Sequence, residues 1–543
     1  MRTRRSRSEK ARSARSPGTV RASLACLLLA TAALVACASP APERRDVVVG
    51  IVGEPASVFA EDPFARLVAA AVTEQLVRRD ARGDLVPRLA MTVPTLENGA
   101  ARVEHDATAP DGRLVADFRL RSGLRWQDGE PITAADVFFA FAQERLAPAG
   151  SEARWIADHV ERVEVTGERD VRFAYRAGER WADYPLAARV LPRHVLAAAD
   201  AGARAKFARE PVHAGPFAVA AWIPGFGVTL SAFKDHVLGP PALGRIEIRF
   251  LSDRRAVLDA LRHGEIDVAP SPALEADLSR TLDRIADGTE RTGLQAYYTP
   301  SEALDVLRFG GSRFADARAR RAVELTIDRQ GIVDDVFAGR ARIPASYLVP
   351  PLWAAAENTA PARPDRDAAR ALLAAAGFAR GNFGILERGG ERMTVALLVA
   401  SGSVGRTDAA RRVAGDLAAV GIAAEVRERP IADVLGLVAR GEFDLALMPQ
   451  RADDPDVATE VYRGLAGPWF DALAAAVRST ADRGEKRSLY AEMQRVWSSE
   501  LPALPLYQHL QVDVAPRALT GVQPSPAGDA LTWSARDWRF AAP

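Results

Sequence analysis

Two stretches of the chain repeat the same alternation of strand-like and helix-like apolar patterns. In the first, GRIEIRFLSD has apolar residues at every second position and is followed by the helix-like DRRAVLDALRHG and by EIDVAPS. In the second, at 390–450, the strand-like MTVALLVAS, IAAEVRE and FDLALMP are separated by the helix-like TDAARRVAGDLAAVG and IADVLGLVARG. Strands that alternate with helices in this way form parallel sheets with right-handed crossovers. The pattern predicts two α/β regions, at 46–270 and 300–480.

The first of these regions contains a β-rich insert. The region itself begins with DVVVGIVG, at 46–53, which is typical of a buried strand. FARLVAAAVTEQLVRRD follows at 64–80 and has the spacing of an amphipathic helix. Within 85–190, however, VADFRLRSGLRW alternates like an antiparallel strand over 116–126, and VERVEVTGERDVRFAYRAG predicts a hairpin with a polar turn. This insert is therefore expected to differ from the α/β regions around it.

One segment of the insert, LRWQDGEPITAADVFFAF, predicts a turn followed by a capped helix. Its Asp-Gly pair supplies the positive-φ position of a turn, and its proline cannot continue a strand ladder. Thr133 followed by Asp136 matches a capping box, which marks the start of a helix. On that helix we expect Val137, Phe138 and Phe141 to pack beneath the insert's sheet as core.

The amino terminus has the pattern of a lipoprotein export signal. A basic stretch precedes ASLACLLLATAALVA, which is too short to span a bilayer as a mature helix and matches the apolar region of a secretory signal. LVAC follows directly, ending at Cys37, and small residues before a cysteine are the pattern cleaved by lipoprotein signal peptidase. The sequence predicts a signal peptide at 1–36 and lipid attachment at Cys37, which would anchor an exported protein to a membrane. An ordinary signal peptide containing a cysteine is the alternative.

Charge and cysteine content fit an exported, membrane-tethered protein. Residues 1–36 carry eight of the 71 basic and one of the 70 acidic side chains, so the remaining body has a net charge of −6. A mildly acidic body gives no broad attraction to phosphate backbones, so no nucleic-acid partner is expected. The only cysteines are Cys26 and Cys37, so a processed and lipidated chain would hold no free thiol and no disulfide.

The chain lacks the common catalytic and metal-binding motifs. The seven histidines show no HxxxH or HExxH spacing, and there is no GxSxG elbow, Walker loop or GxGxxG. We therefore expect no enzyme activity, no metal site and no cofactor. One acidic cluster stands out in QRADDPDV, which follows the predicted strand FDLALMP. Ligands of open α/β sheets gather at the carboxyl ends of strands, although a solvated turn explains the cluster equally well. Carboxylates here could hold an amine, and Arg451 could hold a carboxylate or phosphate.

The segment DFRLRSGLRWQDGEPITAADVFFAF resembles the signature of extracellular solute-binding family 5, the binding proteins of oligopeptide, dipeptide and nickel ABC importers. Further blocks follow in the family's order, among them TEQLVRRDARGDLVPRLA, PVHAGPFAVAAWIPG, FADARARRAVELTIDRQGIVDDVFAGRA and GEFDLALM. The resemblance covers about 46–520. It implies a two-lobed α/β fold of the type II, cluster C periplasmic binding proteins, with an extra β-rich subdomain in lobe I. The lobe boundaries that it implies are 46–77, 191–268 and 481–543 for lobe I, 78–190 for the subdomain, and 269–480 for lobe II.

The resemblance also implies a mechanism and a site. Ligand would favour closure of the two lobes, and the closed form would dock on permease subunits. In peptide-binding members an aspartate four residues before a proline binds the ligand's amine, but that position here is Arg451, and Gly310 replaces a usual asparagine. The expected polar ligand contacts are Arg451, Asp453, Asp454 and Asp456, and the expected aromatic walls are Trp155 and Tyr507.

The function expected from the sequence is a monomeric, lipid-anchored binding protein that delivers a peptide or similar small solute to an ABC importer. Because of the departures at Arg451 and Gly310, a non-peptide anionic solute is an alternative. A ligand-binding sensor or adaptor, and a cell-wall-processing hydrolase, are alternatives from other classes.

Overall fold

The structure is a computed structural model, and it describes residues 45–149, 151–178, 183–274, 293–356, 360–451, 454–525 and 530–541. The predicted signal peptide, Cys37 and Asp453 lie outside these ranges. Arg45–Ala541 form one compact unit. Within the described part of the chain, no helix combines the length and apolarity needed to cross a bilayer.

A four-stranded sheet forms the core of what we call the first lobe. Its order is β1 (Asp46–Val52), β10 (Arg245–Leu251), β9 (Gly227–Ala232) and β8 (Phe217–Ile223), with β1 parallel to β10. After β10 the chain forms α7 (Arg254–His263), which Asp253 caps at its start and Gly264 ends at φ 75°, and it returns beside β1, where Val268 bridges Val49 in parallel. The predicted strand–helix–strand unit is confirmed, although its last strand is a single bridge.

The first helix of this lobe is shorter than predicted. α2 (Pro63–Val72) ends eight residues before the predicted end at residue 80, and Val77–Arg79 form β2, paired with β3 (Leu85–Pro87). The Val72 carbonyl accepts a hydrogen bond from the N–H of Gly215 at 2.9 Å, and a Cβ on Gly215 would meet that carbonyl oxygen at 2.2 Å. A distant backbone contact therefore ends the helix where the local apolar pattern would continue it.

The β-rich insert is a separate antiparallel sheet, as predicted. Its strand order is β4 (Ala101–Asp106), β5 (Ala109–Arg119), β7 (Asp170–Tyr175) and β6 (Val160–Val165), and it packs with α3 (Ala134–Glu144) and α4 (Glu152–His159). The hairpin prediction is confirmed by β6 and β7. The strand predicted at 116–126 begins earlier and ends at Arg119.

The capped helix of the insert is confirmed, with one error in its core face. Gly129 has φ 94° in the turn, and the Asp136 carboxylate accepts the Thr133 N–H at 2.9 Å. Val137 and Phe141 are buried, but Phe138 is 47% exposed. Adjacent helical positions lie about 100° apart, so Val137 and Phe138 cannot both face the sheet. The prediction that all three pack as core was wrong for Phe138.

The second lobe is built on a six-stranded sheet with the order β12–β19–β11–β18–β16–β17. β16 (Thr394–Ala400) is parallel to both β17 (Ala423–Arg429) and β18 (Leu445–Arg451), and α12 (Val404–Ala418) and α13 (Ile431–Arg440) connect them. This confirms the predicted α/β region at 390–450. The other elements of the lobe are α9 (Ala317–Thr326), α10 (Arg329–Phe337), β12 (Ala341–Arg342), α11 (Arg366–Ala375), β13 (Ala379–Arg380), β14 (Leu386–Arg388), β15 (Glu391–Arg392), α14 (Pro455–Glu460), α15 (Gly467–Ser479) and α16 (Arg483–Glu500).

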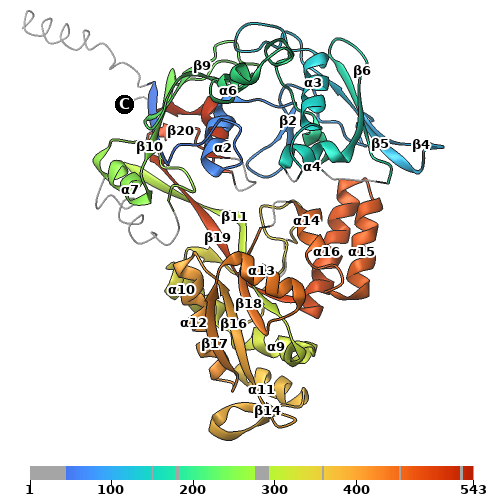
Figure 1. Ribbon diagram of the computed structural model, residues 1–543, viewed down its shortest axis with the longest axis vertical. Helices are drawn as coiled ribbons and strands as arrows, with labels where there is room; N and C mark the ends of the chain where they lie inside the picture. The colour runs from blue at the N-terminus through green and yellow to red at the C-terminus, as the bar shows by residue number, and fades with distance from the viewer. Residues whose placement is uncertain are drawn as a thin grey trace, which may run out of the picture. The chain divides into compact units, whose positions relative to one another are not determined.

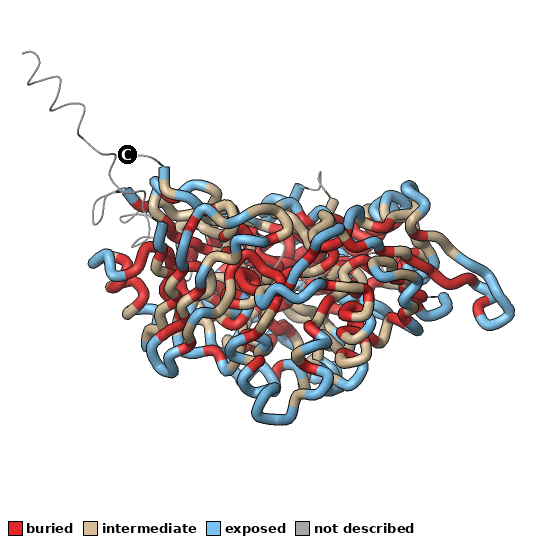
Figure 2. The backbone as a smooth tube through the Cα atoms, turned by 90° about the horizontal axis from the view of Figure 1, so that it is seen from above, coloured by how far each residue is buried: buried red, intermediate tan, exposed pale blue. Residues whose placement is uncertain are grey.

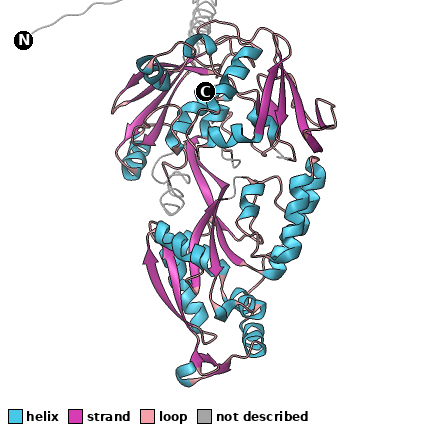
Figure 3. Ribbon diagram, turned by 45° about the vertical axis from the view of Figure 1, so that its right-hand side comes forward, coloured by secondary structure: helices cyan, strands magenta, loops and turns pink. Residues whose placement is uncertain are grey.

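Two long strands connect the cores of the lobes. β11 (Leu294–Phe309) and β19 (Ala503–Pro516) pair antiparallel, and Figure 1 shows them running from the first lobe into the second. Leu294 packs in a cluster of the first lobe, whereas Leu307 packs in one of the second. The register of the pair shifts between Pro300 and Leu304, so the crossing region is irregular. Figure 3 shows this strand pair between the two groups of helices.

The segment 481–543 divides between the lobes instead of belonging to lobe I alone. In α16, Tyr490, Met493 and Trp497 pack in the second lobe with Tyr347 and Phe470. The later Leu531, Ala535 and Trp538 pack in the first lobe, where η5 (Leu531–Asp537) contacts α2. The amphipathic pattern of α16 predicts a buried face but not which sheet covers it. The remaining short elements are α5 (Arg193–Leu196), α6 (Ala201–Arg209), η1 (Tyr184–Ala187), η3 (Ser312–Phe314), η4 (Asn382–Gly384), β20 (Leu519–Thr520) and β21 (Arg539–Phe540).

Figure 2 shows that buried positions lie mainly in the interior of the fold and exposed positions mainly along its outside.

Candidate functional site

The predicted acidic segment lies at the carboxyl end of β18, as the sequence indicated. β18 ends at Arg451, and Asp454 caps α14 by accepting the N–H groups of Asp456 at 2.8 Å and Val457 at 3.2 Å. Asp454 therefore has a structural role at a helix start, where a carboxylate also complements the helix dipole.

Arg451 lies beside a buried acid that sequence reasoning missed. Its side chain is 63% exposed, and its Nη2 lies 4.0 Å from Oε2 of Glu302, whose side chain is 5% exposed. Glu302 belongs to the irregular part of β11, where the register shift lies and where Ala303 pairs with Arg451. Only the fold brings these two positions together.

Asp456 contacts the first turns of α16. Its Oδ1 accepts a hydrogen bond from the Tyr490 hydroxyl, and its Oδ2 lies 3.7 Å from Nζ of Lys486. Lys486 is 1% exposed. Burial lowers the pKa of Lys486, and the neighbouring Asp456 and Asp454 carboxylates offset part of that effect.

An aspartate of the first lobe reaches the same helix. The buried Asp183 accepts a hydrogen bond from Nη2 of Arg79 at 2.6 Å, and its other oxygen lies 3.6 Å from Nη2 of Arg483, the first residue of α16. Burial lowers the pKa of the Arg79 guanidinium, but the Asp183, Asp454 and Glu302 carboxylates outweigh it and raise the pKa overall. Arg79, Asp183 and Arg483 thus form a contact between the two lobes.

These residues form one set of opposite charges where the lobes meet, which we call the inter-lobe charged cluster. It consists of Arg79, Asp183, Glu302, Arg451, Asp454, Asp456, Arg483 and Lys486. Such a set can hold charged groups of a solute through charge-assisted hydrogen bonds. It contains no nucleophile–base pair, and no group of metal-binding side chains occurs anywhere in the described residues.

The two predicted aromatic walls are not part of the cluster. Tyr507 is fully buried in the second lobe, where its hydroxyl donates to Asp305 at 2.6 Å. It is a core residue, because the strand β19 turns this side chain towards the helices. Trp155 is 37% exposed on α4 and packs on His159 at 4.2 Å between ring centroids. Family position alone did not fix the direction of either side chain.

One signal in the sequence could have revealed Lys486. Lys486, Tyr490, Met493 and Trp497 follow one another at intervals of four, three and four residues, which places all four on one face of a helix. Lys486 therefore lies on the buried stripe of α16. A lysine on an apolar stripe is unusual and indicates a partner or a function. Arg79 and Asp183 gave no comparable signal.

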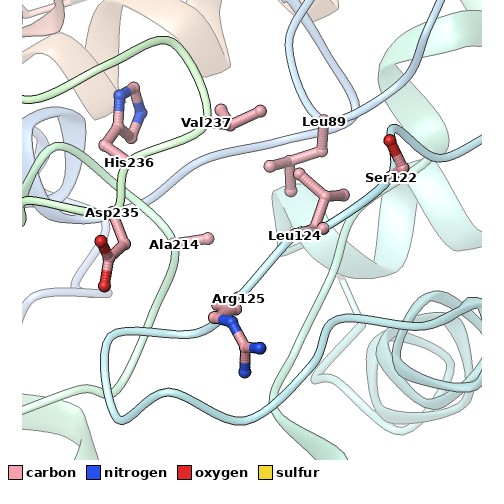
Figure 4. A pocket seen from close by; sticks show the side chains of 9 residues that line it. Leu89, Ser122, Leu124, Arg125, Ala214, Asp235, His236 and Val237 are labelled. Carbon is pink, nitrogen blue, oxygen red and sulfur yellow. The ribbon is translucent and has the colours of Figure 1, made fainter.

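A separate pocket of about 190 Å³ lies in the first lobe. Figure 4 shows Arg125, Asp235 and His236 around it, with Leu89 and Leu124 opposite. Arg125 donates to the Gly129 carbonyl at 2.7 Å, and His236 contacts the buried Glu74 at 3.3 Å, so both have structural partners. The pocket shares no lining residue with the inter-lobe charged cluster.

Comparison with known proteins establishes the class of this chain. The sequence profile of the bacterial extracellular solute-binding proteins, family 5 (Middle), matches residues 85–470. The chain therefore belongs to this family of non-catalytic solute-binding proteins, and its mixed α/β fold is the two-lobed fold of the cluster C periplasmic binding proteins.

Individual relatives match along most of their length. The chain is 24% identical to the oligopeptide-binding protein AppA of Bacillus subtilis (strain 168), over 89% of this chain and 90% of that protein. It is 27% identical to di/tripeptide-binding protein 2 of Pseudomonas aeruginosa (strain UCBPP-PA14), over 78% and 83%. Its fold is similar to the crystal structure of NikA from Brucella suis in complex with Fe(III)-EDTA, with a TM-score of 0.73, 18% identity, and 91% and 100% coverage.

Proposed function

We propose that the protein is the lipid-anchored solute receptor of an ABC importer, which captures a peptide or a similar small solute between its lobes and delivers it to a membrane permease. The observation that carries this proposal is the charged cluster, with residues of both lobes, beside the strand pair β11–β19 that connects them. A solute that contacts both lobes stabilises the arrangement in which they approach each other. Family membership and the names of the oligopeptide-binding and di/tripeptide-binding relatives support the solute class.

The experiment is to identify what the protein carries. We expect mass spectrometry of the protein purified without its signal peptide to find a bound peptide or small charged solute at no more than one per chain. Adding that solute back to stripped protein should raise the melting temperature. Chemical conversion of the solute during incubation would contradict a binding role and favour the hydrolase alternative.

The membrane anchor is tested separately. Expression of the full chain should give a protein in the membrane fraction, and Cys37→Ser should release it or leave its signal peptide uncleaved. A Cys37→Ser variant that loses its signal peptide and still stays in the membrane fraction would contradict lipid attachment at this residue. Genes for a permease and an ATPase beside the gene for this chain would favour transport over a sensor or adaptor role.

A non-peptide anionic solute remains the second candidate, and one observation favours it. Arg451, at the position where the resemblance implies an amine-binding aspartate, is 63% exposed beside the cluster. A bound phosphorylated or acidic compound would support this candidate.

A further inference from the structure

Several hydrogen-bond donors at the start of α16 have no acceptor. Nε and Nη2 of Arg483, Nζ of Lys486 and Nε1 of Trp353 are all buried and make no hydrogen bond within the described part of the chain. All four atoms are donors, and two of the three side chains are cationic. This combination is unusual, because buried polar groups in native proteins almost always have partners.

The donors belong to one cluster. The Arg483 guanidinium lies 4.7 Å above the ring of Trp353, and Trp353 packs edge-on against Tyr490 at 5.7 Å between ring centroids. Lys486 lies one helical turn from both Arg483 and Tyr490 on the same face of α16. We call Arg483, Lys486 and Trp353 the donor cluster.

Each acid nearby uses one carboxylate oxygen for another group, and Oδ1 of Asp183 makes no hydrogen bond with the described residues. Asp456 accepts the Tyr490 hydroxyl and stays 3.7 Å from Lys486, and Asp183 accepts Arg79 and stays 3.6 Å from Arg483. Both distances exceed a hydrogen bond. These acids reduce the electrostatic cost of burying the cations, but they leave the N–H donors unsatisfied.

An added oxyanion would satisfy these donors. A carboxylate has two oxygens and about four acceptor positions, and it matches the planar fork of an arginine. Each buried donor left unpaired costs about 1–3 kcal/mol, so an acceptor that reaches several of them at once gains affinity.

We propose that the donor cluster is the subsite that binds an oxyanion of the captured solute, most simply the carboxylate of a peptide or organic acid. The inference deepens the proposed function and rests on it, because it names the chemical class of the solute. Asp183 of the first lobe contacts Arg483, so an oxyanion here lies where the lobes meet and stabilises their approach. Arg483 and Lys486 are therefore binding residues, and Asp183 is a positioning residue.

The test compares solutes with and without the anion. The probes are mixed tripeptides to pentapeptides of alanine, glycine and leucine with free carboxyl termini, and the same peptides as carboxyl-terminal amides. By calorimetric titration of the protein, the free acids should bind at least about tenfold more tightly than the amides. Lys486→Met should weaken free-acid binding at least about tenfold and remove the preference over amides. Equal binding of acids and amides by the wild type, or an unchanged preference in Lys486→Met, would overturn the proposal.

Two further variants separate binding from folding. Arg483→Met removes a cation whose side chain is 29% exposed, so it tests the same subsite at less risk to the core. Arg495→Met removes the same charge from the same helix at a side chain that is 71% exposed, and its affinities should equal those of the wild type. Circular dichroism melts should show cooperative unfolding for all variants. If Arg495→Met lost as much affinity for the free-acid peptides as Arg483→Met does, the assignment would be overturned.

A third arm distinguishes the failure of this inference from that of peptide capture. If no peptide binds, melting temperatures are measured in acetate and in inorganic phosphate against chloride at matched ionic strength. A rise in the wild type that is lost in Lys486→Met would support the oxyanion subsite and reject peptides as the solute, with the stronger anion indicating the source. Equal responses of the two proteins would overturn the subsite.

Discussion

Two buried ion pairs in this protein are built in opposite ways. In the first lobe, the 1% exposed Glu74 accepts Nε and Nη2 of Arg88 at 3.0 and 2.7 Å, and a nitrogen of His236 lies 3.3 Å away. In the second lobe, the equally buried Lys486 has an acidic oxygen 3.7 Å away and no hydrogen bond to any described residue. We call the first pair complete, because its hydrogen bonds are made within the chain. We call the second pair incomplete, because Lys486 makes no hydrogen bond to the described residues.

The difference teaches how to separate structural charges from binding charges. A buried charge is tolerated when its hydrogen bonds are made inside the fold, and Glu74 joins the segment after α2 to Arg88, just after β3, and to His236 in this way. A buried charge whose donors stay unpaired reduces stability unless another molecule completes it. We therefore interpret the Glu74 pair as scaffold and the donor cluster as a binding site.

The largest expected effect is on the complete pair. Glu74→Gln keeps the shape of the side chain but leaves the Arg88 cation, only 14% exposed, without its counter-ion. We expect the free energy of unfolding to fall by about 3–5 kcal/mol, measured by urea denaturation at neutral pH. The matched control is Glu104→Gln, whose side chain is 46% exposed beside a 36% exposed Arg102, and it should cost less than about 1 kcal/mol. Similar losses in both variants would remove the distinction drawn here.

The next effect is a pH dependence beside the same pair. Burial lowers the pKa of His213 to about 4 from 6.5, and its Nδ1 accepts the N–H groups of Glu74 and Ala214 at 3.2 and 2.9 Å. As the pH falls, His213 is therefore protonated in the unfolded chain before it is protonated in the folded one. The stabilisation that neutral His213 contributes is full above pH 6.5 and is lost as the pH falls to about 4.

His213→Asn tests that dependence, because the amide oxygen can accept in place of Nδ1. The stability difference between wild type and variant should shrink by roughly 3 kcal/mol between pH 7 and pH 4. Asp513, whose pKa burial raises to about 6, changes stability in the opposite sense but equally in both proteins. Parallel stability curves would show that His213 does not titrate in this way.

A smaller effect is expected at Tyr507. Tyr507→Phe removes the hydroxyl that donates to the buried Asp305. Asp305 still accepts a hydrogen bond from Nε of Arg406 at 3.0 Å. The free energy of unfolding should fall by about 1–2 kcal/mol. Affinity for the co-purified solute should stay within about twofold of wild type. A loss of affinity without a loss of stability would contradict the core role of Tyr507 and indicate that it contacts the solute.

The smallest effect on stability is expected at the incomplete pair. Lys486→Met removes a buried cation that makes no hydrogen bond to the described residues. Asp456 still accepts the hydrogen bond from the Tyr490 hydroxyl in this variant, and its side chain is 30% exposed to water. The free energy of unfolding should stay within about 1 kcal/mol of wild type or rise. A loss as large as that of Glu74→Gln would mean that Lys486 is also scaffold.

Local patterns predicted most of the fold. The alternation at 390–450 specified the strands β16 to β18 and their helices, and Thr133 with Asp136 specified the start of α3. Features that depend on distant contacts were not predictable in this way. The early end of α2 depends on Gly215, and the placement of α16 depends on which core covers its apolar stripe.

The candidate site was predictable only in its contiguous part. Arg451, Asp454 and Asp456 lie at or just after the end of one strand and were identified together, although the capping role of Asp454 was not. Glu302, Asp183 and the α16 cations come from three other segments, and only tertiary structure places them beside that strand. Apart from Lys486, which lies on the apolar stripe of α16, their charges are ordinary in the sequence, and the unpaired donors are visible only in three dimensions.

The central claim is that the lobes close around a solute that they do not alter. Small-angle X-ray scattering of the protein, with and without the solute identified by mass spectrometry, tests it most directly, with the solute analysed again after the measurement. The account predicts a smaller radius of gyration with solute present and the solute recovered unchanged. Identical scattering in both states, together with steady consumption of the solute, would contradict it.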